Sequence, residues 1–372
     1  MLPFLRASKS QNLMLNFNLY NAIVMMKKIL FITGSINQTS QMHQIAKHLK
    51  DYDCWFSQLF PDSAFLKAIV KYTSFANGTV LKGQFRAKSE NYLQQHDLQV
   101  DYGGNKNKYD LVVYCTDMVV ANKFKQTKTI WVQEGMIDKR TFLTGIVKAL
   151  GMAPYFTGDT SLNGSTNICD IYCAASEGYK NHFANSGTDR KKLVVTGIPN
   201  YDDHFQFIDN DFPLHDYVMV ATSDMRETYK FENRPAFIKH AAKIANGRQL
   251  LFKLHPNEKF DRARAEIRKH APAGALIYHN GNTNHMIANC SELITQYSTV
   301  VYTGIALGKK VHSYFDVDEL KRLAPIQNGG ASAKNIAGVC RNFIEYKGMK
   351  EDFISQFKFE PEVIKYRELQ YA

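Results

Sequence analysis

The residues LLFKLHPN at positions 250–257 join an apolar run of strand length to a His-Pro pair. Proline cannot continue a β-ladder, and it biases the residue before it towards an extended conformation. We therefore expect a strand over 250–254 that leaves His255 at its carboxyl end. In open α/β sheets, this end of the strands is where ligands bind.

A second stretch, ELITQYST at 292–299, has the same form, because a strand pattern ends in the hydroxyl residues Ser298 and Thr299. A helical pattern over 300–307 follows directly. A helix start with free N–H groups, a positive dipole end and two hydroxyls is suited to binding a phosphate. The separation of the two turns along the chain fits a βαβα unit, so both are expected at one edge of a parallel sheet.

Three short motifs in this order resemble the donor-binding half of GT-B glycosyltransferases: KLHP at 253–256, QYST at 296–299 and ALGK at 306–309. The most similar groups are bacterial sialyl- and polysialyltransferases, capsule Kdo transferases and CDP-glycerol-type polymerases. UDP-N-acetylglucosamine 2-epimerase shares the architecture. The resemblance implies an α/β protein of the GT-B fold, with two Rossmann-like parallel-sheet domains facing each other across a cleft.

The resemblance also implies a division of the chain. We predict an N-terminal acceptor domain over 27–209, a C-terminal nucleotide-sugar domain over 210–345, and a helical tail over 346–372 that crosses back to the first domain. The sequence GIPN at 197–200 is what GT-B proteins place just before the chain crosses to the second domain. Residues 1–26 are interpreted as an extension outside the core, because an internal start codon would place the natural beginning just before the first strand pattern.

Length and composition are compatible with two such domains, since 372 residues with 45% hydrophobic content can form two cores. The net charge of +11 comes without a stretch that interleaves basic residues with stacking aromatics, so we predict no nucleic-acid partner. A basic surface would instead attract nucleotide-sugars, acidic glycans or anionic lipid headgroups. No apolar run reaches the roughly 18 to 20 residues of a membrane span. We expect a cytoplasmic protein and keep open a peripheral contact with the inner face of the cytoplasmic membrane.

The first strand pattern, 28–33, leads into the polar turn GSINQTSQ at 34–41. It has the form of a ligand-binding βα turn, although it is neither a P-loop nor a GxGxxG motif. In GT-B proteins the corresponding loop lies over the cleft and touches the acceptor or the sugar. Gly34 and Ser35 are therefore candidate ligand contacts, and the alternative is a plain first βα turn.

Glu134 is the candidate general base. It stands at the carboxyl end of an apolar strand pattern and before Gly135, so its side chain is expected to face the cleft. It resembles the acidic-acidic-Gly motif of sialyltransferase-like enzymes, in which a carboxylate takes the proton from the acceptor hydroxyl, although the first position here is Gln133. The alternative is a carboxylate that caps the following helix. Asp117 and Asp138 are the reserve candidates.

Glycosyl transfer also requires compensation of the charge that grows on the leaving phosphate. GT-B proteins provide it with helix ends and side chains. The predicted donor-binding residues are Arg226, Lys253, His255, Pro256, Ser298 and Thr299. An ion pair, for instance with Glu227, is the alternative for Arg226, and a histidine that only shapes the strand end is the alternative for His255. No Asp-x-Asp dyad or His/Cys cluster is present, so we predict no metal and no cofactor beyond the nucleotide-sugar substrate.

The nucleotide is not fixed by these motifs. Many UDP-using relatives place a Glu five residues before the Gly of the ALGK-like segment, where it grips the ribose. Thr303 stands at that position here, and one hydroxyl cannot supply the paired acceptor oxygens that clasp two ribose hydroxyls. CMP-activated donors such as sialic acid or Kdo are therefore as open as UDP-sugars.

The sequence thus favours a glycosyltransferase that moves a sugar to a glycan or lipid-linked acceptor in bacterial surface polysaccharide synthesis, such as capsule or lipopolysaccharide. An enzyme like the 2-epimerase is the first alternative. That enzyme carries a His-Arg-Arg-Glu-Asn stretch where this chain has DMRET at 224–228, so the epimerase histidine is missing. The second alternative is a non-catalytic sugar-nucleotide-binding module.

Overall fold

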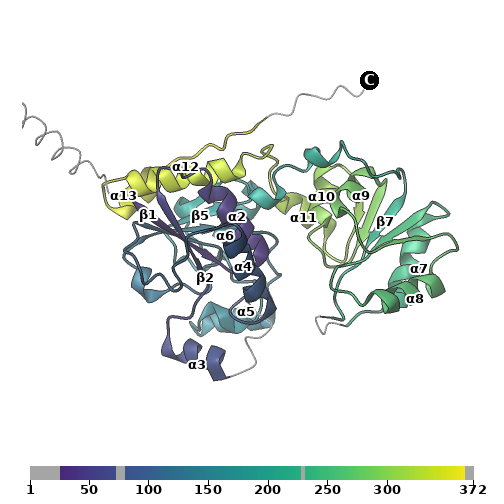
Figure 1. Ribbon diagram of the computed structural model, residues 1–372, viewed down its shortest axis with the longest axis horizontal. Helices are drawn as coiled ribbons and strands as arrows, with labels where there is room; N and C mark the ends of the chain where they lie inside the picture. The colour runs from purple at the N-terminus through teal and green to yellow at the C-terminus, as the bar shows by residue number, and fades with distance from the viewer. Residues whose placement is uncertain (1–25, 73–79, 228–230, 365–372) are drawn as a thin grey trace, which may run out of the picture.

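The computed structural model describes residues 26–72, 80–227 and 231–364, which form two lobes, each built around a parallel sheet (Figure 1). Most of the predicted N-terminal extension, the last eight residues of the predicted tail and Thr228 of the DMRET stretch lie outside the described residues.

The first lobe contains a six-stranded sheet in the order β2-β1-β3-β4-β5-β6, in which every neighbouring pair is parallel. Its strands are buried almost throughout, as expected where helices cover both faces of a parallel sheet. The strands are β1 (Lys28–Thr33), β2 (Asp53–Gln58), β3 (Leu111–Tyr114), β4 (Lys128–Val132), β5 (Ile171–Ala174) and β6 (Leu193–Val195).

Short connections and helices link these strands. The helices of this part of the chain are α2 (Ile36–Ala46), α3 (Ala64–Tyr72), α4 (Gln84–Gln95), α5 (Phe142–Ala149) and α6 (Glu177–Ser186), with 3-10 turns η2 (Asn122–Phe124), η3 (Pro154–Thr157) and η4 (Arg190–Lys192). The predicted turn at 34–41 is mostly helix, because Ser35 and Gln38 form a capping box that starts α2 at Ile36.

The second lobe contains a five-stranded parallel sheet in the order β11-β10-β7-β8-β9. Its strands are β7 (Val218–Ala221), β8 (Leu250–Lys253), β9 (Leu276–Tyr278), β10 (Glu292–Thr295) and β11 (Lys310–His312). Its helices are α7 (Arg234–Ala245), α8 (Phe260–His270), α9 (Thr283–Asn289), α10 (Val301–Ala306) and α11 (Val317–Leu323). The two Rossmann-like sheets confirm the predicted fold class.

The chain returns to the first lobe earlier than predicted. Helix α12 (Ser332–Glu345) lies along the first lobe and buries Ile336, Val339 and Phe343 in a cluster shared with β1 and β3 to β5 (Figure 1). The crossing therefore lies between α11 and α12, and the predicted end of the second domain at residue 345 is wrong by one helix. Helix α13 (Lys350–Gln356) follows, and residues 357–364 have no regular structure, so the tail is helical for only part of the predicted length.

The two crossings between the lobes are bonded to each other. The first includes the 3-10 turns η5 (Pro199–Tyr201) and η6 (Phe205–Phe207). Asp202 in this connection accepts a hydrogen bond from the Ser332 backbone N–H at 2.7 Å, and the Asn328 amide donates to the Thr196 carbonyl at 2.8 Å. Each crossing is thus held in place by the other.

Helices α6 and α11 form a second contact between the lobes. The Ser176 hydroxyl donates to the Leu323 carbonyl at 3.0 Å, and the buried hydroxyls of Tyr179 and Tyr302 lie 3.0 Å apart. A Cβ added at Gly178 would stand 1.9 Å from the Arg322 carbonyl oxygen. Only glycine permits this approach of the two backbones.

We predict opposite effects for two Gly→Ala substitutions in helices. Gly178→Ala should cost about 1–3 kcal/mol, because the methyl group forces α6 away from the Arg322 carbonyl. Gly145→Ala in α5 should be neutral or gain up to about 1 kcal/mol, since nothing lies within 4 Å of its added Cβ and alanine favours the helix. Urea unfolding measures both, and equal effects would contradict the proposed packing.

Candidate functional site

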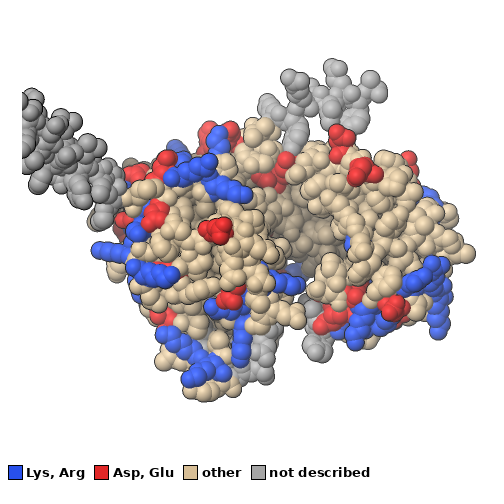
Figure 2. Space-filling view, viewed as in Figure 1, with Lys and Arg blue, Asp and Glu red and all other residues tan. Residues whose placement is uncertain are grey.

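In each sheet the strand order reverses at one point, and the carboxyl edge at that point is the expected place of a ligand site. The reversal falls between β1 and β3 in the first sheet and between β7 and β10 in the second. Open α/β sheets bind ligands at such switch points, because the connecting loops diverge to opposite faces and leave a crevice. Figure 2 shows the two lobes joined along one side and separated by a cleft on the other.

Glu134 follows β4 at the first of these edges and is half-buried. The preceding residue, Gln133, is fully buried and uses its whole amide group: Nε2 donates to the Gly135 carbonyl at 2.8 Å, and Oε1 accepts from the Ala175 N–H at 2.9 Å. A carboxylate could not donate the first of these bonds. The departure from an acidic residue at this position therefore has a structural reason, because the amide fixes the backbone on both sides of Glu134.

The turn after β1 supports Glu134 through Gln38. The Gln38 side chain accepts from the Ser35 N–H at 2.8 Å and lies near enough to the Glu134 carboxyl to influence its pKa. A Cβ at Gly34 would lie 2.2 Å from Gln38 Oε1, so glycine leaves room for this side chain. Gly34 and Ser35, predicted as ligand contacts, thus position Gln38, and the Ser35 hydroxyl accepts the Gln38 N–H of the capping box.

Burial raises the pKa of Glu134 above its ordinary value, and the nearby Gln38 side chain opposes this only in part. A carboxylate with a raised pKa holds a proton more readily near neutral pH. This is the change that suits a general base or acid, whose efficiency is highest when its pKa lies close to the working pH.

Tyr201, at the end of η5, connects this edge to the second lobe. Its ring lies against Gly135, and the Glu134 carboxylate is near enough to raise the pKa of its phenol, to which burial contributes most. The Thr299 side chain of the second lobe lies near enough to the same phenol to lower its pKa, which opposes the rise only in part. Tyr201 therefore bridges the candidate base and the predicted phosphate turn.

The second lobe presents His255 in the turn that follows β8. Its carbonyl accepts from the Glu258 N–H at 3.0 Å, which closes a four-residue turn with Pro256 at the second position, where proline is favoured. The ring atom Nδ1 accepts from the Asn257 N–H at 3.2 Å. In the neutral ring the proton must then lie on Nε2, so this atom can donate to a ligand.

Ser298 and Thr299 follow β10, on the other side of β7. Because β8, β7 and β10 are adjacent and parallel, the two turns lie at one edge of the sheet, about 10 Å apart at ordinary strand spacing. Helix α10 begins at Val301, after both hydroxyls, and has only six residues. The predicted contribution of a helix dipole is therefore small, and the hydroxyls and the loop N–H groups remain as the candidate phosphate donors.

A buried amide lies between these turns. Gln296 Oε1 accepts from the Ser223 hydroxyl at the end of β7 at 2.9 Å. Its Nε2 is fully buried and has no hydrogen-bond partner among the described residues. The amide ties β7 to β10 at the switch point and leaves a donor there.

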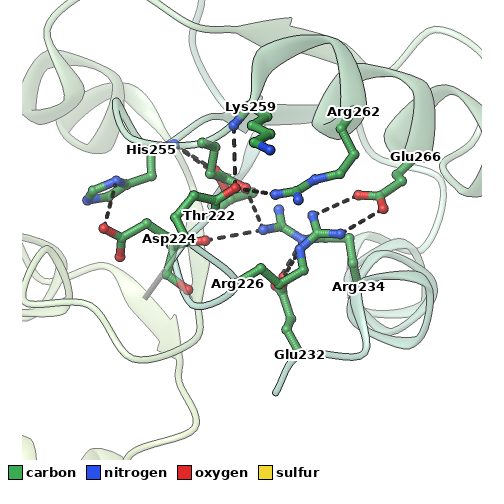
Figure 3. Close-up of polar contacts among 12 residues, drawn as sticks. Thr222, Asp224, Arg226, Glu232, Arg234, His255, Lys259, Arg262 and Glu266 are labelled. Carbon is green, nitrogen blue, oxygen red and sulfur yellow. Dashed lines mark hydrogen bonds and ion pairs between the residues drawn. The ribbon is translucent and has the colours of Figure 1, made fainter. Parts of the chain in front are cut away.

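Arg226 does not reach toward a donor phosphate. Its guanidinium makes two parallel hydrogen bonds to Glu266 at 2.7 and 2.8 Å and an ion pair with Glu232 at 3.0 Å (Figure 3). The bond to Arg226 holds the pKa of Glu266 below its ordinary value. The structure thus gives Arg226 the ion-pair role that was the alternative, with Glu266 and Glu232 as its partners and Glu227 paired to Arg262 instead.

Lys253 is also engaged within the protein. Its side chain is buried, and Nζ donates to the carbonyls of His279 at 2.8 Å and Leu254 at 3.1 Å. It holds the ends of β8 and β9 together. In this arrangement of the chain Lys253 has a structural role, and its binding of the donor stays a prediction.

A network of hydrogen bonds and ion pairs holds the His-Pro turn in place (Figure 3). Buried Glu258 accepts from the His255 N–H at 2.9 Å and from the Arg234 guanidinium at 2.5 Å, and it also bonds to Thr222. Arg234 is only 1% exposed and pairs with Glu232 as well. The charges of Glu258 and Arg234 orient the turn and are buried away from any ligand.

The reserve carboxylates and Thr303 have other partners. Asp117 is fully buried and accepts bonds from Gly164, Thr166 and Tyr172. Exposed Asp138 accepts from Thr160, which makes it an anchor for a loop. Neither replaces Glu134 as the candidate base. Thr303 is buried, and its hydroxyl points to Asn284, so it offers nothing to a ribose.

Two of these site residues escaped sequence reasoning. Tyr201 directly follows the GIPN motif, but only the folded crossing brings it against Gly135 and Thr299. Gln38 could have been noticed, because Ser35 followed three residues later by Gln is the signature of a capping box.

Within residues 26–72, 80–227 and 231–364, no group of three or more His, Cys, Asp or Glu side chains is arranged to hold a metal ion. Across the same part of the chain, no helix combines the length and apolar character that crossing a bilayer requires.

Comparisons with known proteins bear on the fold. No protein-family model and no curated protein sequence matches the chain. Among solved structures, a proposed UDP-N-acetylglucosamine 2-epimerase from Listeria monocytogenes matches 91% of this chain and 100% of its own, with a TM-score of 0.52 and 12% identity. MnaA of S. aureus with UDP matches 86% of this chain and 97% of its own, with a TM-score of 0.50 and 14% identity. UDP-N-acetylglucosamine 2-epimerase from Rickettsia bellii matches 86% of this chain and 98% of its own, with a TM-score of 0.50 and 11% identity. At such low identity these matches establish the fold alone, and the fold is GT-B.

We predict that Glu134→Gln stabilises the protein in a pH-dependent way. Because the folded-state pKa of Glu134 lies above its ordinary value of about 4.5, the parent loses stability as pH rises from that value through the raised pKa. The variant should therefore melt at a higher temperature than the parent at about pH 7.5, and the difference should shrink toward about pH 4.

Melting curves of parent and variant across this pH range measure the effect. The matched control is Glu360→Gln, which removes an exposed carboxylate outside any helix or strand. The difference in melting temperature between the parent and this control should not change with pH. A gap between parent and Glu134→Gln that does not change with pH would show that burial does not disfavour this charge.

Proposed function

We propose that the protein is a metal-independent glycosyltransferase that moves a sugar from a CMP- or UDP-activated donor to a glycan or lipid-linked acceptor of the bacterial surface. The observation that carries the proposal is the link through Tyr201. Tyr201 lies between Glu134, a half-buried carboxylate with a raised pKa, and Thr299 at the switch point of the second sheet. A base on one side of a cleft and a phosphate turn on the other are the two groups that glycosyl transfer needs.

The donor's phosphate lies, in this proposal, between the turns that carry His255 and Ser298. The His255 ring has its proton on Nε2 and is partly exposed, with 34% of its side chain accessible. A hydrogen bond from this proton to a phosphate oxygen strengthens as charge develops on the leaving group. The hydroxyls of Ser298 and Thr299 supply further donors from the neighbouring turn.

Glu134 takes the acceptor's hydroxyl proton as the new glycosidic bond forms. Its raised pKa makes this transfer more favourable than for an exposed glutamate. Gln133 and Gln38 hold it in position, since Gln133 hydrogen-bonds to the loop and Gln38 lies close to the carboxyl itself.

The epimerase alternative is less well supported. The histidine of the corresponding epimerase stretch is replaced by Asp224, and the next arginine of this chain, Arg226, is bound to Glu266 and Glu232. The structural matches to epimerases do not raise this alternative, because they share the fold at 11% to 14% identity.

We predict that UDP or CMP raises the melting temperature of the protein, since a ligand that binds only the folded state stabilises it. His255→Ala should weaken the responding nucleotide by about ten- to hundredfold, the loss of one hydrogen bond to a charged group. Glu134→Gln should keep the nucleotide shift and lower sugar transfer by about 10²- to 10⁴-fold. Thermal-shift titration with UDP, CMP, GDP and CDP, followed by nucleotide release from the matching donor with a glycan acceptor, measures these effects.

The control for His255→Ala is His215→Ala, an exposed histidine before β7 at the opposite edge of the same sheet. If neither UDP nor CMP shifted the melting temperature, the donor assignment would be lost. Equal nucleotide binding by His255→Ala would remove that residue from the phosphate site. Turnover that yields an epimer with the nucleotide still attached would identify the epimerase, and binding with no turnover would identify a binding module.

Exposed apolar residues support a peripheral membrane contact as part of this function. We call Phe142, Leu143, Leu150, Met152 and Phe156 the α5 patch; they belong to α5, to η3 and to the connection between them, and all five side chains are exposed. Several large apolar side chains exposed on one short segment favour an interaction site there. Exposed Lys139, Arg140 and Lys148 flank the patch, so a bilayer with anionic headgroups complements both its apolar and its charged part.

We predict that the protein floats with vesicles of mixed phosphatidylglycerol and phosphatidylcholine. Replacing Phe142 and Leu150 together by serine should reduce the bound fraction at least about tenfold, since each large side chain contributes about 1.5–3 kcal/mol of apolar burial. Phe231→Ser is the matched control, because Phe231 is 87% exposed, compared with 86% for Phe142, but lies in the other lobe. Equal losses in both variants, or no binding by the parent, would contradict the membrane contact.

A further inference from the structure

A second pocket lies in the first lobe, at the carboxyl end of β2, and the site described above does not use it. Its cavity volume is about 380 Å³, within the usual range of ligand sites. The residues used in the following argument are Gln58, Phe60, Arg86, Tyr102 and Lys123.

One of the residues that line this pocket, Gln58, carries a buried acceptor without a partner among the described residues. Gln58 is only 1% exposed, and its Nε2 donates to the Arg86 carbonyl at 2.8 Å, which fixes the orientation of the amide. Its Oε1 has no hydrogen-bond partner among the described residues. A buried acceptor left unpaired costs about 1–3 kcal/mol, so this atom indicates a ligand that carries a hydroxyl or amide donor.

Two cations line the pocket, and one of them, Arg86, can donate further hydrogen bonds. Arg86 uses Nε for an ion pair with Glu90 at 3.0 Å, and its two terminal nitrogens make no bond to protein among the described residues. Lys123 is exposed, and its ammonium donates to the Gly104 carbonyl at 2.8 Å and to Asn105 at 2.9 Å. Lys123 thus contributes charge, whereas Arg86 can make new hydrogen bonds to a carboxylate or a phosphate. Figure 2 shows Lys and Arg side chains gathered at this lower end of the first lobe, over α3.

Two aromatic rings complete the pocket. Tyr102 is 46% exposed, and Phe60 is half-buried beneath the Lys123 ammonium at 5.3 Å. Flat apolar rings beside hydrogen-bonding groups suit the C–H face of a sugar ring, which is apolar on one side and bears hydroxyls at its rim.

The pocket also stands in a useful relation to Glu134. Strands β2 and β4 are separated by β1 and β3, so their carboxyl ends lie about 14 Å apart on one edge of the sheet. An acceptor oligosaccharide whose reacting hydroxyl is at Glu134 would therefore place a sugar residue two or three units away at this pocket.

We infer that this pocket binds an anionic sugar residue, carboxylated or phosphorylated, of the acceptor glycan. The inference rests on the proposed transferase function for its role, but the binding itself does not depend on turnover. Gln58 Oε1 accepts a sugar hydroxyl, Arg86 pairs with the anionic group, and Tyr102 packs against the ring.

The test is a binding titration that needs no donor. Cellobiuronic acid, glucose 6-phosphate and neutral cellobiose are titrated by NMR into the parent, Arg86→Gln and Lys88→Gln. Arg86→Gln leaves the backbone carbonyl that holds Gln58 in place. Lys88→Gln is the matched control, since it removes one positive charge from the same helix at an exposed position outside the pocket.

We expect the parent to bind at least one of the two anionic sugars at least about tenfold more tightly than cellobiose, a difference of about 1.4 kcal/mol. Arg86→Gln should remove that preference, and Lys88→Gln should retain it. Preference for the carboxylate or for the phosphate then names the anionic group. The inference is overturned if cellobiose binds as well as both acids, if Lys88→Gln and Arg86→Gln lose the same affinity, or if nothing binds. If the protein is not a transferase, the nucleotide-binding and turnover measurements will show it. The sugar titration is independent of those measurements.

Discussion

The close approach of α6 to α11 is the constraint on which the rest of the structure depends. Gly178 admits the Arg322 carbonyl, and the Tyr179 and Tyr302 hydroxyls meet behind it. Since neither backbone can move nearer or farther without losing these contacts, the two sheet edges face each other at a set separation. The Tyr201 bridge between Gly135 and Thr299 exists only because of that spacing.

Within the second lobe, a buried ionic network fixes the conformation of the His-Pro turn. Glu258 binds the His255 N–H and the Arg234 guanidinium, and both charged groups are withdrawn from water. Removing one partner of such a pair typically costs about 3–5 kcal/mol, because the other charge is left buried alone. The turn is thereby held in one conformation before any ligand arrives, which reduces the entropy lost on binding.

The first lobe uses neutral amides for the same purpose. Gln133 hydrogen-bonds through both ends of its side chain, and Gln38 accepts from the Ser35 N–H close to the Glu134 carboxyl. Because these supports are neutral and no cation of the described residues contributes, burial dominates and the pKa of Glu134 rises. An arginine in place of Gln38 would have stabilised the charged form and made the carboxylate a weaker base.

The sequence by itself determined the two parallel sheets, the strands that carry Glu134, His255 and Ser298, and their common carboxyl edges. It could do so because apolar runs and Gly, Pro and Ser/Thr turns are local signals. Which polar side chains stay free for a ligand was decided only by the tertiary structure. Arg226 follows a strand as His255 does, and Lys253 is the last residue of one, but distant partners, Glu266 and the His279 carbonyl, occupy them. Partners of this kind are brought together by packing between elements far apart in the chain, and no local pattern records them.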